Sequence, residues 1–384
     1  MKKHVLVFLF SCCLTAGFAT NYEELTKNFI TGRADVQSIS VMSFGPEGIL
    51  FLGDSKAGKV FALDLNDREK NDSQESVNIE NLEARLGSAL GVGPKEVVVH
   101  DLAVNPISQN IYLAVSRSDA MKVDFWKLPN DIAYATILLK IKPDGALEPI
   151  SFDNIRYSVA DVPNVIAEGK ENWRKSDERT DAITDIAYDE GRLYVAGLSN
   201  EEFASALRVL DFPFTEKALF STIEVWHVAH AKSETEAPIR TLIPYTVDGK
   251  KYILASYTCT PLASIPVDDL KPGAHIKSKT LAEFGSGNMP VDIIRYNSNG
   301  RDYFMMSNSA KALIRIDAAN ISKQEKGLTE PLPDGQYTAG LPHDVLSSVG
   351  ITQIDNLNAS NILTLQRRPN GNLDLRSVRV RRGS

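Results

Sequence analysis

The chain has 384 residues, of which 43% are hydrophobic, so it is long and apolar enough to bury a large core. Its 49 Asp and Glu residues outnumber its 42 Lys and Arg residues, which gives a formal net charge of −7 at pH 7. Because nucleic-acid binding depends on cationic side chains that neutralise phosphates, this balance argues against a nucleic-acid partner.

The beginning of the chain has the pattern of an export signal. A positively charged start precedes an apolar run from Val5 to Leu14, and Ala19 supplies the small residue that a signal peptidase requires. We predict a signal peptide over residues 1–19 and a periplasmic or secreted protein. Lipoprotein processing at Cys12 is the alternative. No later run approaches the roughly 20 apolar residues of a membrane helix, so we predict no transmembrane segment.

Two segments have helical character. Residues 20–36 form a polar N-terminal segment. Residues 77–90 are predicted to be a short surface helix, and Gly91 follows as a C-terminal stop. The apolar residues that recur there at helical spacing are Ile79, Leu82, Leu86 and Leu90.

Residues 37–384 are predicted to form a single domain built from repeats. One strand–turn–strand pattern returns six times, as a comparison of 40–54, 185–197 and 292–307 illustrates. Repetition at intervals of about 40 to 60 residues is typical of a β-propeller. We therefore predict an all-β propeller of six blades, at 37–65, 97–141, 182–228, 239–284, 289–321 and 349–380. Two further segments, 150–160 and 220–230, are either outer strands or parts of a seventh blade.

The predicted topology brings two sets of loops to one end of the central channel. The loop that leads into the innermost strand of a blade and the loop between its second and third strands lie on the same face, here called the top face. Polar residues of these loops should line any binding site. The candidate ligand-binding residues are Asp54, Lys56, Asp101, Arg117, Asp185, Asn200, Asp292 and Asn308.

Three of these candidates, Asp101, Asp185 and Asp292, occupy the same position at the start of an innermost strand. They could hold a divalent cation such as Ca²⁺, which prefers several oxygen ligands. Alternatively, short acceptors here would bind backbone amides of their own turn or of the next blade. We favour the second interpretation, because a repeated residue serves the repeat first. His100, beside Asp101, is the candidate catalytic base.

The remaining chemically versatile residues give weaker signals. His227 and His230 are three residues apart and would point to opposite faces of a strand, which weakens a metal chelate. Cys259 is the single cysteine outside the predicted leader. The sequence does not tell whether its thiol is buried or reactive.

The segments 44–54, 101–106, 111–115 and 292–307 look similar to blades of the YVTN/NHL-type propellers, exported or extracellular repeat proteins that include lactonase-like members. The resemblance covers residues 37–380 as architecture. In the metal-dependent lactonase-like members, a Glu and several Asp or Asn residues ligate a cation at the channel. The resemblance therefore implies such a role for Asp101, Asp185 and Asp292, although no Glu begins an innermost strand here.

Two functions follow from these features. The first is an exported, non-catalytic propeller that binds a protein partner or a small ligand at the top face. The alternative is a metal-dependent, lactonase-like hydrolase or lyase, with carboxylates at the channel mouth and His100 as base. The sequence leaves open whether the protein is an enzyme, and we expect a monomer without a cofactor other than Ca²⁺.

Overall fold

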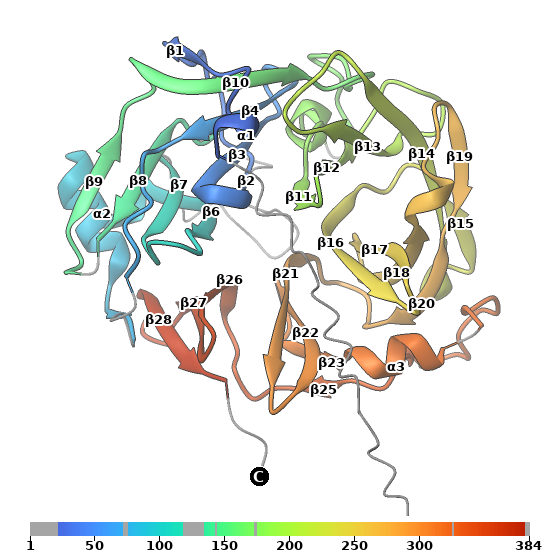
Figure 1. Cartoon of the computed structure of the whole chain (residues 1–384). Coiled ribbons are helices and arrows are strands. Elements are labelled where there is room, and N and C mark those ends of the chain that lie inside the picture. The colour runs from blue at the N-terminus through green and yellow to red at the C-terminus, as the bar shows by residue number, and fades with distance from the viewer. Residues whose placement is uncertain are drawn as a thin grey trace, which may run out of the picture.

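The computed structural model describes residues 22–71, 76–117, 134–142, 144–172, 175–324 and 326–380. The predicted signal peptide and Cys12 lie outside these residues. Six small sheets stand in a ring around a central channel (Figure 1), so the prediction of an all-β, six-bladed propeller is confirmed. We number the blades by the order of their innermost strands along the chain.

Blades 1 and 2 include the segment between residues 150 and 160, which forms an outer strand and not part of a seventh blade. From the channel outward, blade 1 contains β2 (Val41–Phe44), β3 (Ile49–Asp54), β4 (Lys59–Asp64), β10 (Ile155–Asp161) and β1 (Ile30–Gly32). Blade 2 contains β6 (Val97–Val104), β7 (Ile111–Arg117), β8 (Ile137–Ile141) and β9 (Leu147–Ile150).

In blade 3 the outer strand β14 covers residues 220–227 of the predicted segment 220–230, which is therefore not part of a seventh blade. Blade 3 contains β11 (Asp185–Asp189), β12 (Arg192–Leu198), β13 (Ser205–Asp211), β14 (Ala218–His227) and β15 (Lys232–Glu234), and β19 (Ala274–Lys277) also pairs with β14. Blade 4 contains β16 (Ile239–Val247), β17 (Lys250–Tyr257), β18 (Pro261–Pro266), β20 (Lys279–Glu283) and β24 (Ala339–Gly340).

Blades 5 and 6 complete the ring. Blade 5 contains β21 (Pro290–Ser298), β22 (Arg301–Asn308), β23 (Ile314–Asp317) and β25 (Asp344–Val345). Blade 6 contains β26 (Ile351–Asn358), β27 (Asn361–Arg367), β28 (Leu373–Arg379) and β5 (Asn78–Ile79). Among the described residues, the three α-helices are α1 (Tyr22–Leu25), α2 (Leu82–Leu90) and α3 (Ala318–Lys323).

The order of the blades around the ring differs from their order in the chain. The innermost strands contact one another in the circular order β6, β2, β11, β16, β21, β26 and back to β6, so the ring reads 2-1-3-4-5-6 (Figure 1). The apolar core clusters agree, because one joins blade 6 to blade 2 and another joins blade 1 to blade 3. After β4 the chain leaves blade 1 and adds β5 to blade 6. It then builds blade 2 and returns to blade 1 as β10, the fourth strand of that blade. Strands distant in sequence thus fasten the ring at two places.

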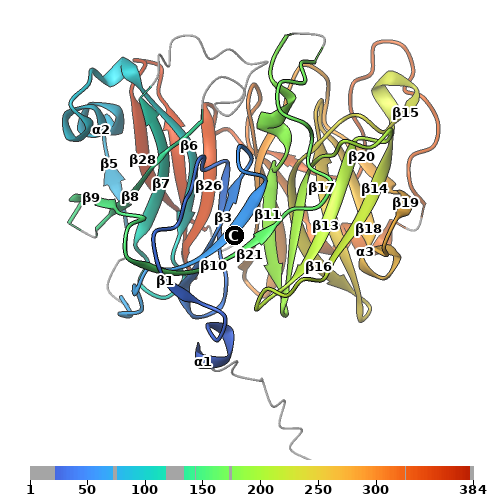
Figure 2. The same cartoon turned by 90° about the horizontal axis from the view of Figure 1, so that it is seen from above.

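The predicted helix at 77–90 is shorter than expected at its N-terminus. α2 begins at Leu82, because Asn78 and Ile79 pair with β28 instead and Asn81 has a positive φ of 51°. The helix ends as predicted, at Gly91, whose φ of 70° is the left-handed conformation that favours glycine. Figure 2 places α2 and β15 at one end of the ring and α1 at the opposite end.

Local sequence explains the hairpins of the repeats. In blade 5 a two-residue loop, Asn299-Gly300, joins β21 to β22, and both residues have positive φ, as this tight turn requires. All six residues of β3 and all eight of β6 are buried, because a blade is packed between two neighbours on both faces. No helix in the described ranges is long and apolar enough to cross a membrane.

Candidate functional site

A cavity of about 1030 Å³ lies at the top face, where the innermost strands begin. Its inner wall contains apolar side chains of several blades, and α2 and the loops after β22 and β27 contribute to its rim. The apolar residues of the wall include Val41, Val99, Ile183, Val291 and Ile351. A concave, mainly apolar chamber with a few polar groups is the usual form of a small-molecule site.

The three predicted aspartates, Asp101, Asp185 and Asp292, line this cavity together with His100 and Asn308. A fourth acid, Asp355 on β26, does not line the cavity but is close enough for its charge to act on Asp101 and Asp292. Each of the four carboxylates accepts a backbone N–H of the adjacent blade at 2.5–2.9 Å. The bridges join Asp101 to Met42, Asp185 to Leu242, Asp292 to Ile354 and Asp355 to Val104.

Three of these acids also accept the amide of the following residue in their own strand. Asp101, Asp185 and Asp355 do so at 2.7–2.8 Å, so each ties its own strand to the neighbouring blade. These contacts are the ones expected if the acids bind backbone amides of their own strand and of the next blade. The carboxylates therefore hold blade 2 to blade 1, blade 3 to blade 4, blade 5 to blade 6, and blade 6 to blade 2.

The channel environment raises the pKa of all four acids. Burial is the main cause and lifts the pKa of Asp185 to about 7 and that of Asp355 to about 6. The pKa values of Asp101 and Asp292 are also well above the usual range, through burial and through the charges of the other acids of the channel. Mutual repulsion thus limits how many of the four can ionise together.

The Ca²⁺ interpretation of Asp101, Asp185 and Asp292 remains a prediction. Among the described residues, a group of His and Glu side chains with ligand atoms within 4.8 Å of one another lies elsewhere, on blade 3. It consists of His227, His230 and Glu234. The geometry of the channel acids is accounted for by their backbone partners.

His100, the candidate base, is buried, with 4% of its surface exposed. Its Nε2 lies 2.6 Å from the Ser116 hydroxyl, and its backbone carbonyl accepts the Gln353 amide at 2.5 Å. One ring nitrogen is therefore engaged within blade 2.

The other predicted ligands are dispersed. Asp54 is fully buried and accepts bonds from the Ser38 hydroxyl and from the amides of Gln37 and Ala57, so it stabilises a turn. The remaining three, Lys56, Arg117 and Asn200, are exposed and lie outside the cavity lining.

Two ion pairs on the cavity rim were not predicted from the sequence. Arg240 binds Asp181 at 2.7 and 3.4 Å. Arg367 binds both oxygens of Glu83, at 2.5 and 2.7 Å, and so joins blade 6 to α2. Asp355, the fifth residue of β26, was also missed.

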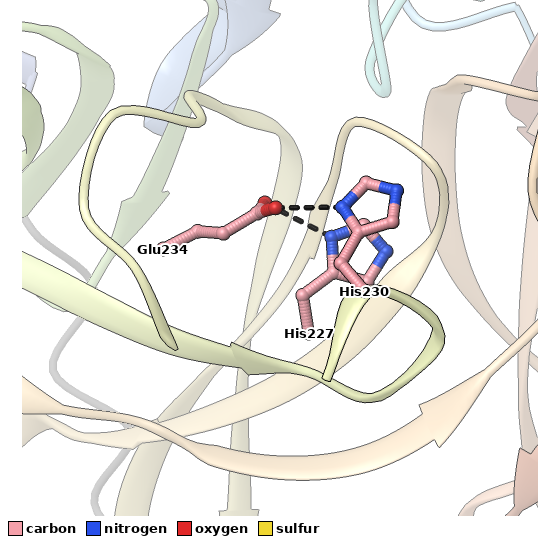
Figure 3. Close-up of side chains that lie close together, drawn as sticks. All are labelled: His227, His230 and Glu234. Carbon is pink, nitrogen blue, oxygen red and sulfur yellow. Dashed lines mark hydrogen bonds and ion pairs between the residues drawn. The ribbon is translucent and has the colours of Figure 1, made fainter. Parts of the chain in front are cut away.

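The interpretation of His227 and His230 was wrong in its geometry. β14 ends at His227, and residues Val228–His230 form a 3₁₀ turn, so the two rings lie close together, with centroids 3.7 Å apart and planes tilted by 38°. Figure 3 shows both rings directed at Glu234. Glu234 accepts from Nδ1 of His227 at 2.9 Å and from Nδ1 of His230 at 2.7 Å. The strand pattern fails because the strand stops between the two histidines.

Comparison with known proteins gives no family. No family model matches the sequence, and no curated protein matches it, so membership of the YVTN/NHL-type propellers remains a prediction.

Three solved structures resemble the chain at low similarity. They are Kuenenia stuttgartiensis hydrazine synthase (10% identity, TM-score 0.32, 91% of this chain and 98% of that chain), Drosophila Plexin A in complex with Semaphorin 1b (11%, 0.35, 91% and 86%) and Drosophila Semaphorin 1b, extracellular domains 1-2 (10%, 0.34, 92% and 86%). The fold assignment is based on the six sheets of this chain itself.

Proposed function

We propose that this protein is an exported, non-catalytic propeller that binds a small organic ligand in the top-face cavity. The observation that carries the proposal is the cavity itself, about 1030 Å³ in volume and walled by apolar side chains of several blades. The proposal of export depends on the predicted signal peptide alone.

The state of the polar groups favours binding over catalysis. The channel carboxylates accept backbone amides, and His100 is engaged with Ser116, so the groups that a hydrolytic mechanism would use already have structural partners. Four cationic side chains, Lys95, Arg240, Lys311 and Arg367, stand among the cavity residues, and two of them are paired with acids. The arrangement suits a ligand with an apolar body and an anionic group at the rim.

The fluorescent probe 1-anilinonaphthalene-8-sulfonate has this chemistry and tests the proposal. We expect saturable binding of the probe to the folded protein with a stoichiometry of one. The variant Val291→Trp places a bulky ring on the cavity wall and should abolish that binding. Val345→Trp is the matched control, because Val345 is 67% exposed on β25, outside the cavity.

Circular dichroism of both variants verifies that the fold is retained. Equal binding by Val291→Trp and by the unmodified protein would contradict a ligand in the cavity. A protein partner that contacts only the rim would bind Val291→Trp as well as it binds the unmodified protein. If Val291→Trp lost the probe but still bound a protein partner, that partner would bind the rim and not the cavity.

A further inference from the structure

The cluster around Glu234 sets the protonation of two histidines. A carboxylate only accepts hydrogen bonds, so when the two rings are neutral their Nδ1 atoms carry the protons donated to Glu234. Each Nε2 is then an unprotonated lone pair. Figure 3 shows both Nε2 atoms on the side of the rings away from Glu234. This is the arrangement in which a carboxylate orients metal-binding histidines from behind.

A second acid lies on that far side. Glu283, at the end of β20, is fully buried, and its Oε2 lies 3.6 Å from Nε2 of His227. Among the described residues, neither carboxylate oxygen of Glu283 nor Nε2 of His227 has a hydrogen-bond partner. The backbone amides of Ala229 and Gly285 approach Glu283 and lower its pKa in part, but burial dominates and raises that pKa to about 8.

Unsatisfied groups of this kind are costly to bury. An unpaired acid in the protein interior costs free energy, either as a poorly hydrated charge or by being held in its protonated form, and an unpaired imidazole nitrogen adds to that cost. A cation held between them would satisfy both groups at once. The side chain of His230, which is 42% exposed, gives the position access to solvent.

We propose that His227, His230 and Glu283 form a zinc-binding site at the seam between blades 3 and 4, with Glu234 as the residue that orients the two histidines. Two imidazoles and one carboxylate are a usual ligand set for Zn²⁺ that keeps a fourth position open. The site is separate from the cavity, although Lys311 of the cavity lining donates to the carbonyl of Phe284, the residue after Glu283.

The separation of His227 and Glu283 fits the metal. Zn²⁺ binds imidazole nitrogen and carboxylate oxygen at about 2.1 Å, so two ligand atoms in a tetrahedral site are about 3.4 Å apart. The 3.6 Å between Nε2 of His227 and Oε2 of Glu283 is close to that value. Further hydrogen bonds join the seam, because the hydroxyls of Ser278, just before β20, and Thr280 on β20 donate to carbonyls of β14 at 2.8 and 2.7 Å.

The experiment titrates the purified full chain, stripped with chelator, with Zn²⁺ in competition with a chromophoric chelator. We expect one Zn²⁺ per chain. His230→Ala should weaken binding by roughly 100-fold or more, as should Glu283→Gln, because each removes a ligand. Glu234→Gln should weaken it by about 10- to 100-fold, the usual effect of losing an orienting partner.

His275→Ala is the matched control. His275 lies on β19 beside β14 and is already bonded to Thr222 and Glu224, so its loss should leave the zinc affinity unchanged. Because His230 is partly exposed, His230→Ala should fold, which circular dichroism verifies.

Absence of stoichiometric Zn²⁺ binding, or equal binding by His230→Ala, would overturn the proposal. If Glu283→Gln bound Zn²⁺ normally while Glu234→Gln did not, Glu234 would be the ligand and the assignment of the two acids would be wrong. An anomalous-scattering peak between His227 and Glu283 in crystals grown with Zn²⁺ would support the ligand set as assigned.

Discussion

Buried or partly buried acids occur in two regions of this propeller, and their surroundings differ. In the channel, Asp101, Asp185 and Asp355 each accept one amide from their own strand and one from the adjacent blade. At the seam between blades 3 and 4, Glu283 lacks a hydrogen-bond partner among the described residues and faces an unpaired nitrogen of His227. A buried acid therefore has a structural role where backbone donors surround it, and it is a candidate cation ligand where they do not.

The largest effect should come from removing a channel acid. Asp101→Ala leaves the buried amides of Met42 and Leu102 without their acceptor, and each loss costs about 1–3 kcal/mol. We expect the free energy of unfolding, measured by urea denaturation, to fall by about 4 kcal/mol.

Asp344→Ala is the control for this experiment. Asp344 pairs with Arg315 on the exposed edge of blade 5, so its removal should change the free energy by no more than about 1 kcal/mol. Equal effects of the two substitutions would show that the channel bonds contribute little.

Zinc should have the next largest effect and should act only at the seam. Zn²⁺ at 100 times its dissociation constant should raise the free energy of unfolding by about 2.7 kcal/mol, because it binds the folded state alone. His230→Ala should lose this stabilisation, whereas Asp185→Asn should keep it. A loss in Asp185→Asn would place the metal in the channel, as the Ca²⁺ interpretation has it.

Stability should also fall as pH rises. The folded-state pKa values of Asp185 and Asp355, about 7 and about 6, lie above the ordinary value of 3.8, so the folded state binds more protons between these limits. The contribution of these acids is fully present below pH 3.8 and is lost as pH rises toward 7. For metal-free protein we expect Asp185 alone to lower the unfolding free energy by about 2.5 kcal/mol from pH 5 to pH 8, measured by thermal denaturation. Asp185→Asn should flatten the profile, and an unchanged profile would contradict the assignment.

The smallest effect should come from Glu283→Gln in metal-free protein. The substitution replaces a buried acid that has no hydrogen-bond partner with a neutral side chain of similar shape, so little stabilisation is lost. We expect the free energy of unfolding to stay within about 1 kcal/mol or to rise slightly, as measured by urea denaturation. A loss as large as that of Asp101→Ala would mean that Glu283 has a structural role like that of the channel acids.

The sequence predicted much of the channel and little of the seam. Asp101, Asp185 and Asp292 recur at one position of a repeat, so the fold itself brings them together at the channel. Asp355 was missed, although it is the fifth residue of β26 as Asp101 is the fifth residue of β6. His227 was misinterpreted because a strand of ten residues stops at it, and no local pattern marks that end.

The sequence alone determined the all-β class, the six strand–turn–strand units and the helix that ends at Gly91, since these depend on periodicity and turn residues within a few neighbouring positions. Only the tertiary structure decided that blade 2 stands between blades 6 and 1, and that Glu283 meets His227 across a seam. Both results depend on packing between sheets that are far apart along the chain, and short-range patterns do not encode which apolar faces meet.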